Sequence, residues 1–251
     1  MIKLIKILYP HPALLLKEEN KKHIIISDLH IGFEERFVKK GISIETSTEK
    51  MKKVLIELIQ QYQPEDVIIL GDVKDSISRI TNSERRELPK FFDDISTYSQ
   101  VRIIPGNHDG GLKSVLAQKV ILESVYGITI EESGLLHGHT KPKQDFVNLD
   151  RIIMGHLHPI FNQPSSPISG SQIWAILKVE KKYLFESSEG IMEIIAIPSF
   201  NTELTTTGFS NYRKKEISPI LRRIRSHVND AIFMTLEGDI IGGLNHVTRL
   251  I

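Results

Sequence analysis

The chain has 251 residues, 40% of them hydrophobic and 25% charged, a composition that argues for a folded globular protein and against a disordered one. Its formal net charge of +1 at pH 7 excludes a strongly basic protein, so any contact with nucleic acid must use a local patch. Cysteine is absent, which excludes disulfides and thiolate zinc sites.

The first sixteen residues are mostly apolar, but Lys3, Lys6, Pro10 and Pro12 interrupt them. Such interruptions argue against both the apolar region of a signal peptide and a membrane span. We therefore expect a soluble, cytoplasmic protein with no membrane association.

The first half of the chain alternates short apolar runs with helical patterns. The apolar runs predict strands at residues 2–8, 13–16, 24–27, 67–70 and 101–104. Helices are expected at residues 33–38, 51–62, 83–98 and 112–118. Thr46 and Glu49 resemble a capping box before the second helix, which Pro64 ends. This order of elements indicates right-handed crossovers and a mainly parallel sheet.

The pattern changes after residue 134, where shorter links join the strands. Antiparallel pairs are expected between residues 172–180 and 191–197, and between residues 231–237 and 240–244. Residues 217–224 show an amphipathic helical pattern with a basic outer face. This segment is either a docked surface helix or a salt-sensitive contact to nucleic acid. We predict one domain, residues 1–251, in which the second half completes a two-sheet body.

Five apolar runs end in clusters of polar residues. The clusters are Asp28-Leu29-His30, Gly71-Asp72, Asn107-His108-Asp109, His137-Gly138-His139 and His156-Leu157-His158. Because sites in parallel sheets form beyond the carboxyl ends of the strands, we expect the clusters to meet. Imidazole nitrogens together with carboxylate oxygens suit Mn, Fe, Zn, Co or Ni. About seven such ligands are too many for one ion, so two ions that share an aspartate fit better.

In this order, the five motifs resemble those of the calcineurin-like metallophosphoesterase superfamily. A wider match includes Asp28-Leu29-His30-Ile31-Gly32, Lys40-Gly41, Gly155-His156-Leu157-His158-Pro159 and Ile197-Pro198-Ser199-Phe200-Asn201. It resembles a prokaryotic branch that contains archaeal phosphoesterases related to the SbcD nuclease and bacterial DNA-ligase-associated phosphoesterases. The resemblance implies an α/β (α+β) fold, namely a four-layer αββα sandwich of two mixed sheets flanked by helices.

The resemblance also implies a role for each ligand. Asp28, His30 and His158 would bind one divalent ion, and Asn107, His137 and His156 a second, with Asp72 bridging the two. The ions, with manganese the first choice, would hold a hydroxide for in-line attack on a phosphoester.

By the same resemblance, His108 would be the general acid that protonates the leaving group, oriented by Asp109. His139 is a candidate contact to the second ion or to a substrate phosphate, or an outer partner of a ligand. Lys74 and Arg36 could each contact phosphate or simply face solvent.

Together these observations predict a hydrolase, a phosphodiesterase or nuclease that acts on DNA or RNA. One alternative is a phosphatase or phosphodiesterase for small nucleotides. Another, of a different class, is a non-catalytic interaction scaffold with the same fold. Candidate partners are a helicase or other DNA-repair protein and a second copy of the chain.

Overall fold

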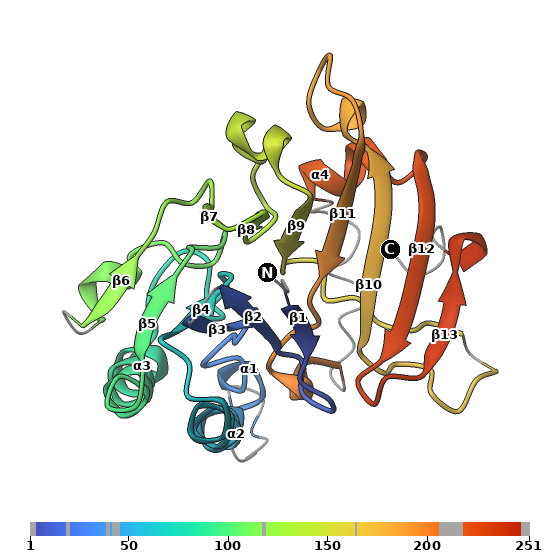
Figure 1. The fold of residues 1–251 in the computed structure, drawn as a ribbon. Helices are drawn as coiled ribbons and strands as arrows, with labels where there is room; N and C mark the ends of the chain where they lie inside the picture. The colour runs from blue at the N-terminus through green and yellow to red at the C-terminus, as the bar shows by residue number, and fades with distance from the viewer. Residues whose placement is uncertain are drawn as a thin grey trace.

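The computed structural model describes residues 4–18, 21–38, 41, 46–116, 119–163, 165–205 and 218–246. The apolar runs of the first half form a six-stranded sheet in the order β1-β2-β3-β4-β5-β6 (Figure 1). Its strands are β1 (Leu4–Ile7), β2 (Leu14–Glu18), β3 (Lys21–Ile26), β4 (Asp66–Ile69), β5 (Gln100–Ile103) and β6 (Val120–Leu122). The pairs from β1 to β3 are antiparallel, and those from β3 to β6 are parallel.

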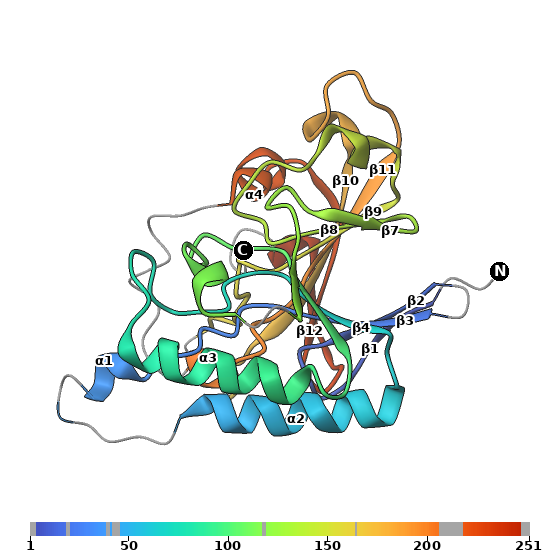
Figure 2. The same cartoon turned by 90° about the vertical axis from the view of Figure 1, so that its left-hand side faces the viewer.

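The central strands of this sheet are continuously apolar because both of their faces are covered. Ile24 and Ile26 of β3 pack with the helix side, whereas Ile25 between them packs toward the second sheet. The covering helices are α1 (Glu35–Val38), α2 (Ser47–Tyr62) and α3 (Asn82–Ile95). Figure 2 shows α2 and α3 lying side by side under the first sheet.

The start of α2 differs from the sequence prediction. Thr46 is the N-cap residue, but its side chain makes no capping hydrogen bond, so the predicted capping box with Glu49 is wrong. The main-chain N–H of Ser47 donates instead to the carboxylate of Glu34, which directly precedes α1. A capping box does form at α3, where Thr81 and Glu84 bond each other's main chain.

The helix expected at residues 112–118 is also wrong within the described residues. Only one 3-10 turn forms, η1 (Leu112–Ser114), and the edge strand β6 follows it. The three apolar residues of β6 are too few to give a periodic signal, and the strand forms because β5 offers a free edge for parallel pairing.

The second half forms a seven-stranded sheet in the order β13-β12-β10-β11-β9-β8-β7. Its strands are β7 (Ile128–Ile130), β8 (Ser133–Leu136), β9 (Arg151–Met154), β10 (Ile173–Glu180), β11 (Ile191–Ala196), β12 (Val228–Thr235) and β13 (Ile240–Gly243). β8, β9 and β11 are parallel. The predicted antiparallel pairs, β10 with β11 and β12 with β13, are confirmed.

A short helix, α4 (Pro219–Ile224), buries Ile220, Leu221 and Ile224 against the outer face of the second sheet. Arg223 donates a hydrogen bond of 3.1 Å to the carbonyl of Leu184, so the helix is docked. The basic run at residues 213–215 and residue 217 lie outside the described residues. The remaining short turns are η2 (Gln144–Asn148), η3 (Lys181–Tyr183), η4 (Thr202–Thr205) and η6 (Leu244–His246).

The two sheets pack face to face over an apolar layer that includes Ile25, Ile68, Ile153 and the fully buried Trp174. With α2 and α3 on one side and α4 on the other, the molecule is a four-layer αββα sandwich of two mixed sheets (Figure 2). The predicted fold class is therefore confirmed. Of the helices that the structure describes, none has the length and apolar character needed to cross a membrane.

Candidate metal centre

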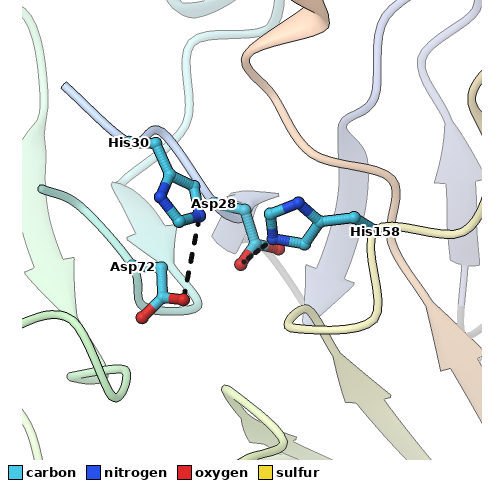
Figure 3. A group of neighbouring side chains, drawn as sticks. All are labelled: Asp28, His30, Asp72 and His158. Carbon is cyan, nitrogen blue, oxygen red and sulfur yellow. Dashed lines mark ion pairs between the residues drawn. The ribbon is translucent and has the colours of Figure 1, made fainter. Parts of the chain in front are cut away.

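The five polar clusters follow the carboxyl ends of five strands, as the sequence predicted. Asp28 comes after β3, Asp72 after β4, Asn107 after β5, His137 after β8 and His156 after β9. Because β3, β4 and β5 are parallel in one sheet and β8 and β9 in the other, their ends lie at common edges. Four of the side chains, Asp28, His30, Asp72 and His158, point toward one another in Figure 3.

The main chain is strained where it displays these side chains. Among the described residues, eight that are not glycine have a positive φ, and five of them are expected ligands. These are Asp28 (55°), His30 (44°), Asp72 (49°), His156 (67°) and His158 (42°). Each left-handed residue costs about 1–3 kcal/mol and persists only where the surrounding contacts impose it. Such a concentration of strain is typical of a functional site.

Two motif glycines are needed because ligands approach their main chain closely. A Cβ atom at Gly106 would lie 2.2 Å from Oδ1 of Asp72, and one at Gly155 would lie 2.6 Å from Oδ2 of Asp28. Any larger residue would therefore push a carboxylate out of the centre.

The first cluster contains Asp28, His30, Asp72 and His158, each of which offers a ligand atom within 4.8 Å of the others. Nε2 of His158 is 3.1 Å from Oδ1 of Asp28, and Nε2 of His30 is 3.7 Å from Oδ2 of Asp72. His30 is buried, yet its Nε2 has no hydrogen-bond partner. A buried nitrogen without a partner is costly, and a cation among these atoms would satisfy it.

The second cluster contains Asp72, His137 and His156. Nδ1 of His137 contacts the carbonyl oxygen of Leu70 at 2.7 Å, so Nε2 is the atom turned to the centre. Nε2 lies 3.3 Å from Oδ2 of Asp72, 3.2 Å from Oδ1 of Asn107 and 3.1 Å from Nδ1 of His156. A single proton on Nε2 can form a hydrogen bond in only one of these three contacts. One cation, by contrast, can bind the lone pairs of all four atoms, which are the two nitrogens and the two oxygens just named. The donor set therefore fits a divalent metal ion.

The electrostatics of the second cluster agree with this fit. Burial alone would raise the pKa of Asp72, but His137, His30 and His108 hold it well below its usual range. Burial opposes a charge on His137, yet the nearby carboxylates of Asp72 and Asp28 raise its pKa to about 9. Metal binding at Nε2 would release that proton.

His156 has the opposite shift. Burial and the neighbouring His137 lower the pKa of His156 to about 3, so its ring is neutral and keeps a lone pair for a metal. His139 lies beside the same cluster, with its ring centre 5.2 Å from that of His137. Burial and His137 lower the pKa of His139 to about 4.

His108 belongs to neither cluster but borders both. Its main-chain N–H donates to Oδ1 of Asp72 at 2.9 Å, and its Nε2 is 3.9 Å from Oδ2 of that residue. Nδ1 contacts the main-chain carbonyl oxygen of Asp75, which requires a hydrogen on Nδ1 and turns Nε2 to the centre. Burial lowers the pKa of His108.

The expectation that Asp109 orients His108 is contradicted. The carboxylate of Asp109 accepts main-chain hydrogen bonds from Val73 at 2.9 Å and from Gly106 at 2.8 Å. It thereby joins the loops that follow β4 and β5. Burial and the charge of Asp72 raise the pKa of Asp109 to about 6.

The contact expected from Asp109 is made instead by the main-chain carbonyl of Asp75, which sequence reasoning missed. That oxygen meets His108, and Oδ1 of Asp75 is 3.4 Å from Nδ1 of His30. The only signal in the sequence was an acidic residue three positions after Asp72.

Both readings of Lys74 are wrong, because its side chain is fully buried and Nζ contacts the carbonyl of Ser76. Its main chain pairs with that of Ile31 in an isolated parallel bridge, and both residues are buried. Arg36 falls in α1, but its side chain is not among those that the structure describes.

A comparison with protein families matches residues 22–160 to the calcineurin-like phosphoesterases. The match covers more than half of the chain and contains all five motifs, so the chain belongs to this family. It is a divalent-metal-binding hydrolase that acts on ester bonds. The alternative of a non-catalytic scaffold is thereby set aside.

Two solved structures are similar to this one. The nuclease MPE of Pseudomonas putida is 18% identical, with a TM-score of 0.55 over 79% of this chain and 82% of that chain. The E. coli phosphoesterase Yfce is 14% identical, with a TM-score of 0.39 over 88% of this chain and 97% of that chain. At 18% identity, the likeness to the nuclease MPE shows the fold alone. The likeness to Yfce has a TM-score of only 0.39 and supports no argument. No curated protein matches the chain in sequence.

Proposed function

We propose that the chain is a two-metal phosphodiesterase that cleaves DNA or RNA. The observation that carries the proposal is Asp72, whose carboxylate belongs to both ligand clusters. One ion would be held by Asp28, His30 and His158, and the other by Asn107, His137 and His156, with Asp72 between them. Manganese is the first candidate, and the nitrogen and oxygen donors also suit Fe, Zn, Co and Ni.

The charge of the ligand set supports a phosphate substrate. Asp28 and Asp72 contribute two negative charges, and the remaining ligands are neutral when they bind metal. Two divalent ions carry four positive charges, so two stay uncompensated and would attract an anionic phosphoester. When bound, such ions supply the charge that activates water and stabilises the phosphoryl oxygens in the transition state.

His108 is the proposed general acid. The carbonyl of Asp75 holds a hydrogen on Nδ1, so the proton for the departing oxygen would come from Nε2 of the doubly protonated, cationic ring. A proton donor is most useful when the leaving group is an alkoxide, as it is in nucleic acids. Placing an imidazole beside the cluster, but outside it, therefore favours a diester with a poor leaving group.

The nucleic-acid part of the proposal rests on resemblance. It is supported by the likeness of the motifs to the branch with SbcD-related phosphoesterases, and by a fold shared with a protein described as a nuclease. The cytoplasmic location, the homodimer and a helicase or other DNA-repair partner stay predictions.

The test compares four substrates at one manganese concentration: a bis-aryl phosphate, an aryl monophosphate, single-stranded DNA and single-stranded RNA. We expect turnover of the bis-aryl ester and of at least one nucleic acid. Asp72→Asn should abolish both activities. Turnover of the monoester alone would refute the nuclease proposal, and turnover of the bis-aryl ester without cleavage of either nucleic acid would favour the small-nucleotide alternative.

A further inference from the structure

The segment that follows β11 has no part in the ligand set, although it belongs to the sequence resemblance. Ser199 and Asn201 in this segment are both fully buried. Their hydrogen bonds run to the loop that carries Asp28 and His30, which lies more than 170 positions earlier in the chain. Buried polar side chains that contact a ligand loop across this separation call for a specific role.

We call the loop that carries Asp28 and His30 the ligand loop. The segment after β11 donates hydrogen bonds to three consecutive main-chain carbonyl groups of this loop. The main-chain N–H of Phe200 donates to Ser27 at 2.8 Å, the hydroxyl of Ser199 to Asp28 at 2.6 Å, and Nδ2 of Asn201 to Leu29 at 3.0 Å. The N–H groups of the same loop point the other way. Those of Asp28 and His30 donate to the loop after β4, at 3.0 and 2.9 Å. The ligand loop is therefore held on both sides.

The side chain of Asn201 is fixed in this position, because both the nitrogen and the oxygen of its amide group make hydrogen bonds. Its Nδ2 also donates to Oγ of Ser47 at 2.9 Å, which ties the loop to the start of α2. Its Oδ1 accepts the main-chain N–H of Glu203 at 3.2 Å. Asp28 and His30 have left-handed φ values of 55° and 44°, a conformation that persists only where neighbouring contacts impose it.

We propose that Ser199 and Asn201 are positioning residues for the first metal site, and that they hold the strained Asp28–His30 loop in its ligand geometry. The inference rests on the metal centre proposed above. Outer partners of metal ligands typically contribute about 10- to 100-fold to metal affinity. The second ion shares Asp72, and its ligand His156 donates a main-chain hydrogen bond to Asp28, but its other ligands follow β5, β8 and β9. Its affinity should therefore change less than that of the first ion.

The test uses Ser199→Ala and Asn201→Asp, each of which removes the donor to the ligand loop with little change in volume. A matched control is Ser188→Ala, because the Ser188 hydroxyl also donates to a carbonyl at 2.6 Å, that of Phe185 between β10 and β11. Each variant is made in two backgrounds. His156→Ala should leave only the first metal site, and His158→Ala only the second.

Manganese binding is measured by titration calorimetry. In the His156→Ala background, Ser199→Ala and Asn201→Asp should each weaken binding about 10- to 100-fold. In the His158→Ala background they should have a smaller effect, and Ser188→Ala should have little effect in both. A loss of structure alone would weaken both sites together, so equal losses in the two backgrounds would overturn the proposal.

A second measurement is hydrogen exchange of the metal-free protein over residues 27–31. Exchange should be faster in Ser199→Ala and Asn201→Asp than in the unaltered chain or Ser188→Ala. Exchange and first-site affinity equal to those of the unaltered chain would refute the positioning role, as would failure of both variants to fold. Failure of the unaltered chain to bind manganese would refute the proposed function, whereas the exchange rates would still decide whether the segment holds the loop.

Discussion

Replacing His108 by alanine should remove the proton donor and leave the metal centre intact. The imidazole belongs to neither ligand cluster, and alanine keeps the main-chain N–H that donates to Asp72 at 2.9 Å. The variant loses the contact between Nδ1 and the carbonyl of Asp75, which should cost about 0.5–1.5 kcal/mol of stability. The protein should therefore stay folded and bind metal normally.

The effect on rate should depend on the leaving group. A positioned general acid contributes about 10²- to 10⁴-fold, which corresponds to about 2.7–5.4 kcal/mol at 1.36 kcal/mol for each factor of ten. An alkoxide needs the proton, so cleavage of DNA should lose this whole factor. An aryl oxide leaves without protonation, so hydrolysis of a bis-aryl phosphate should fall by less than about tenfold.

The assay compares kcat of His108→Ala with that of the unaltered chain for single-stranded DNA and for a bis-aryl phosphate, both at saturating manganese. Calorimetry of manganese binding is run beside it. His227→Ala is the control, because His227 stacks on Tyr183 with ring centres 3.8 Å apart and takes no part in either cluster. Equal losses for the two substrates, or a weaker metal affinity, would refute the assignment of His108 as the acid.

Three further predictions follow from the same structure. Gly106→Ala should weaken manganese binding by at least about tenfold, because its Cβ would meet the carboxylate of Asp72 at 2.2 Å. Gly110→Ala, whose Cβ has 3.8 Å of room, should bind manganese normally, and equal behaviour of the two variants would contradict the packing argument. Chelation should abolish hydrolysis and added manganese should restore it, whereas activity that survives dialysis against chelator would count against metal catalysis. Burial lowers the pKa of His23, but its hydrogen bond to Asp66 more than offsets this, so the pKa is raised. The stability that this raised pKa contributes is complete below about pH 6.5 and lost as the pH rises through the raised value. His23→Gln should therefore lower the free energy of urea unfolding more at about pH 6 than at about pH 8.5, and a cost independent of pH would refute the linkage.

The sequence by itself indicated a mainly parallel first sheet, a two-sheet body and the gathering of the ligand motifs. Apolar runs such as residues 24–27 and 67–70 identify strands covered on both faces, because period and run length report burial. Parallel strands place their carboxyl ends at one edge of a sheet, so Asp28 and Asp72 had to be near each other. These inferences needed only local pattern and the handedness of the connections, whereas the four-layer sandwich came from the resemblance of the motifs to a known family.

Only the tertiary structure decided which groups support those ligands. Asp75 rather than Asp109 meets His108, 33 positions away, and Ser199 reaches the carbonyl of Asp28 across 171 positions. Lys74 is buried although its charge predicts exposure. Each outcome depends on which loops come together when the two sheets pack, and hydrogen bonds between distant loops leave no periodic trace in a sequence. The candidate ligands could therefore be proposed from the chain, but the contacts that orient them could not.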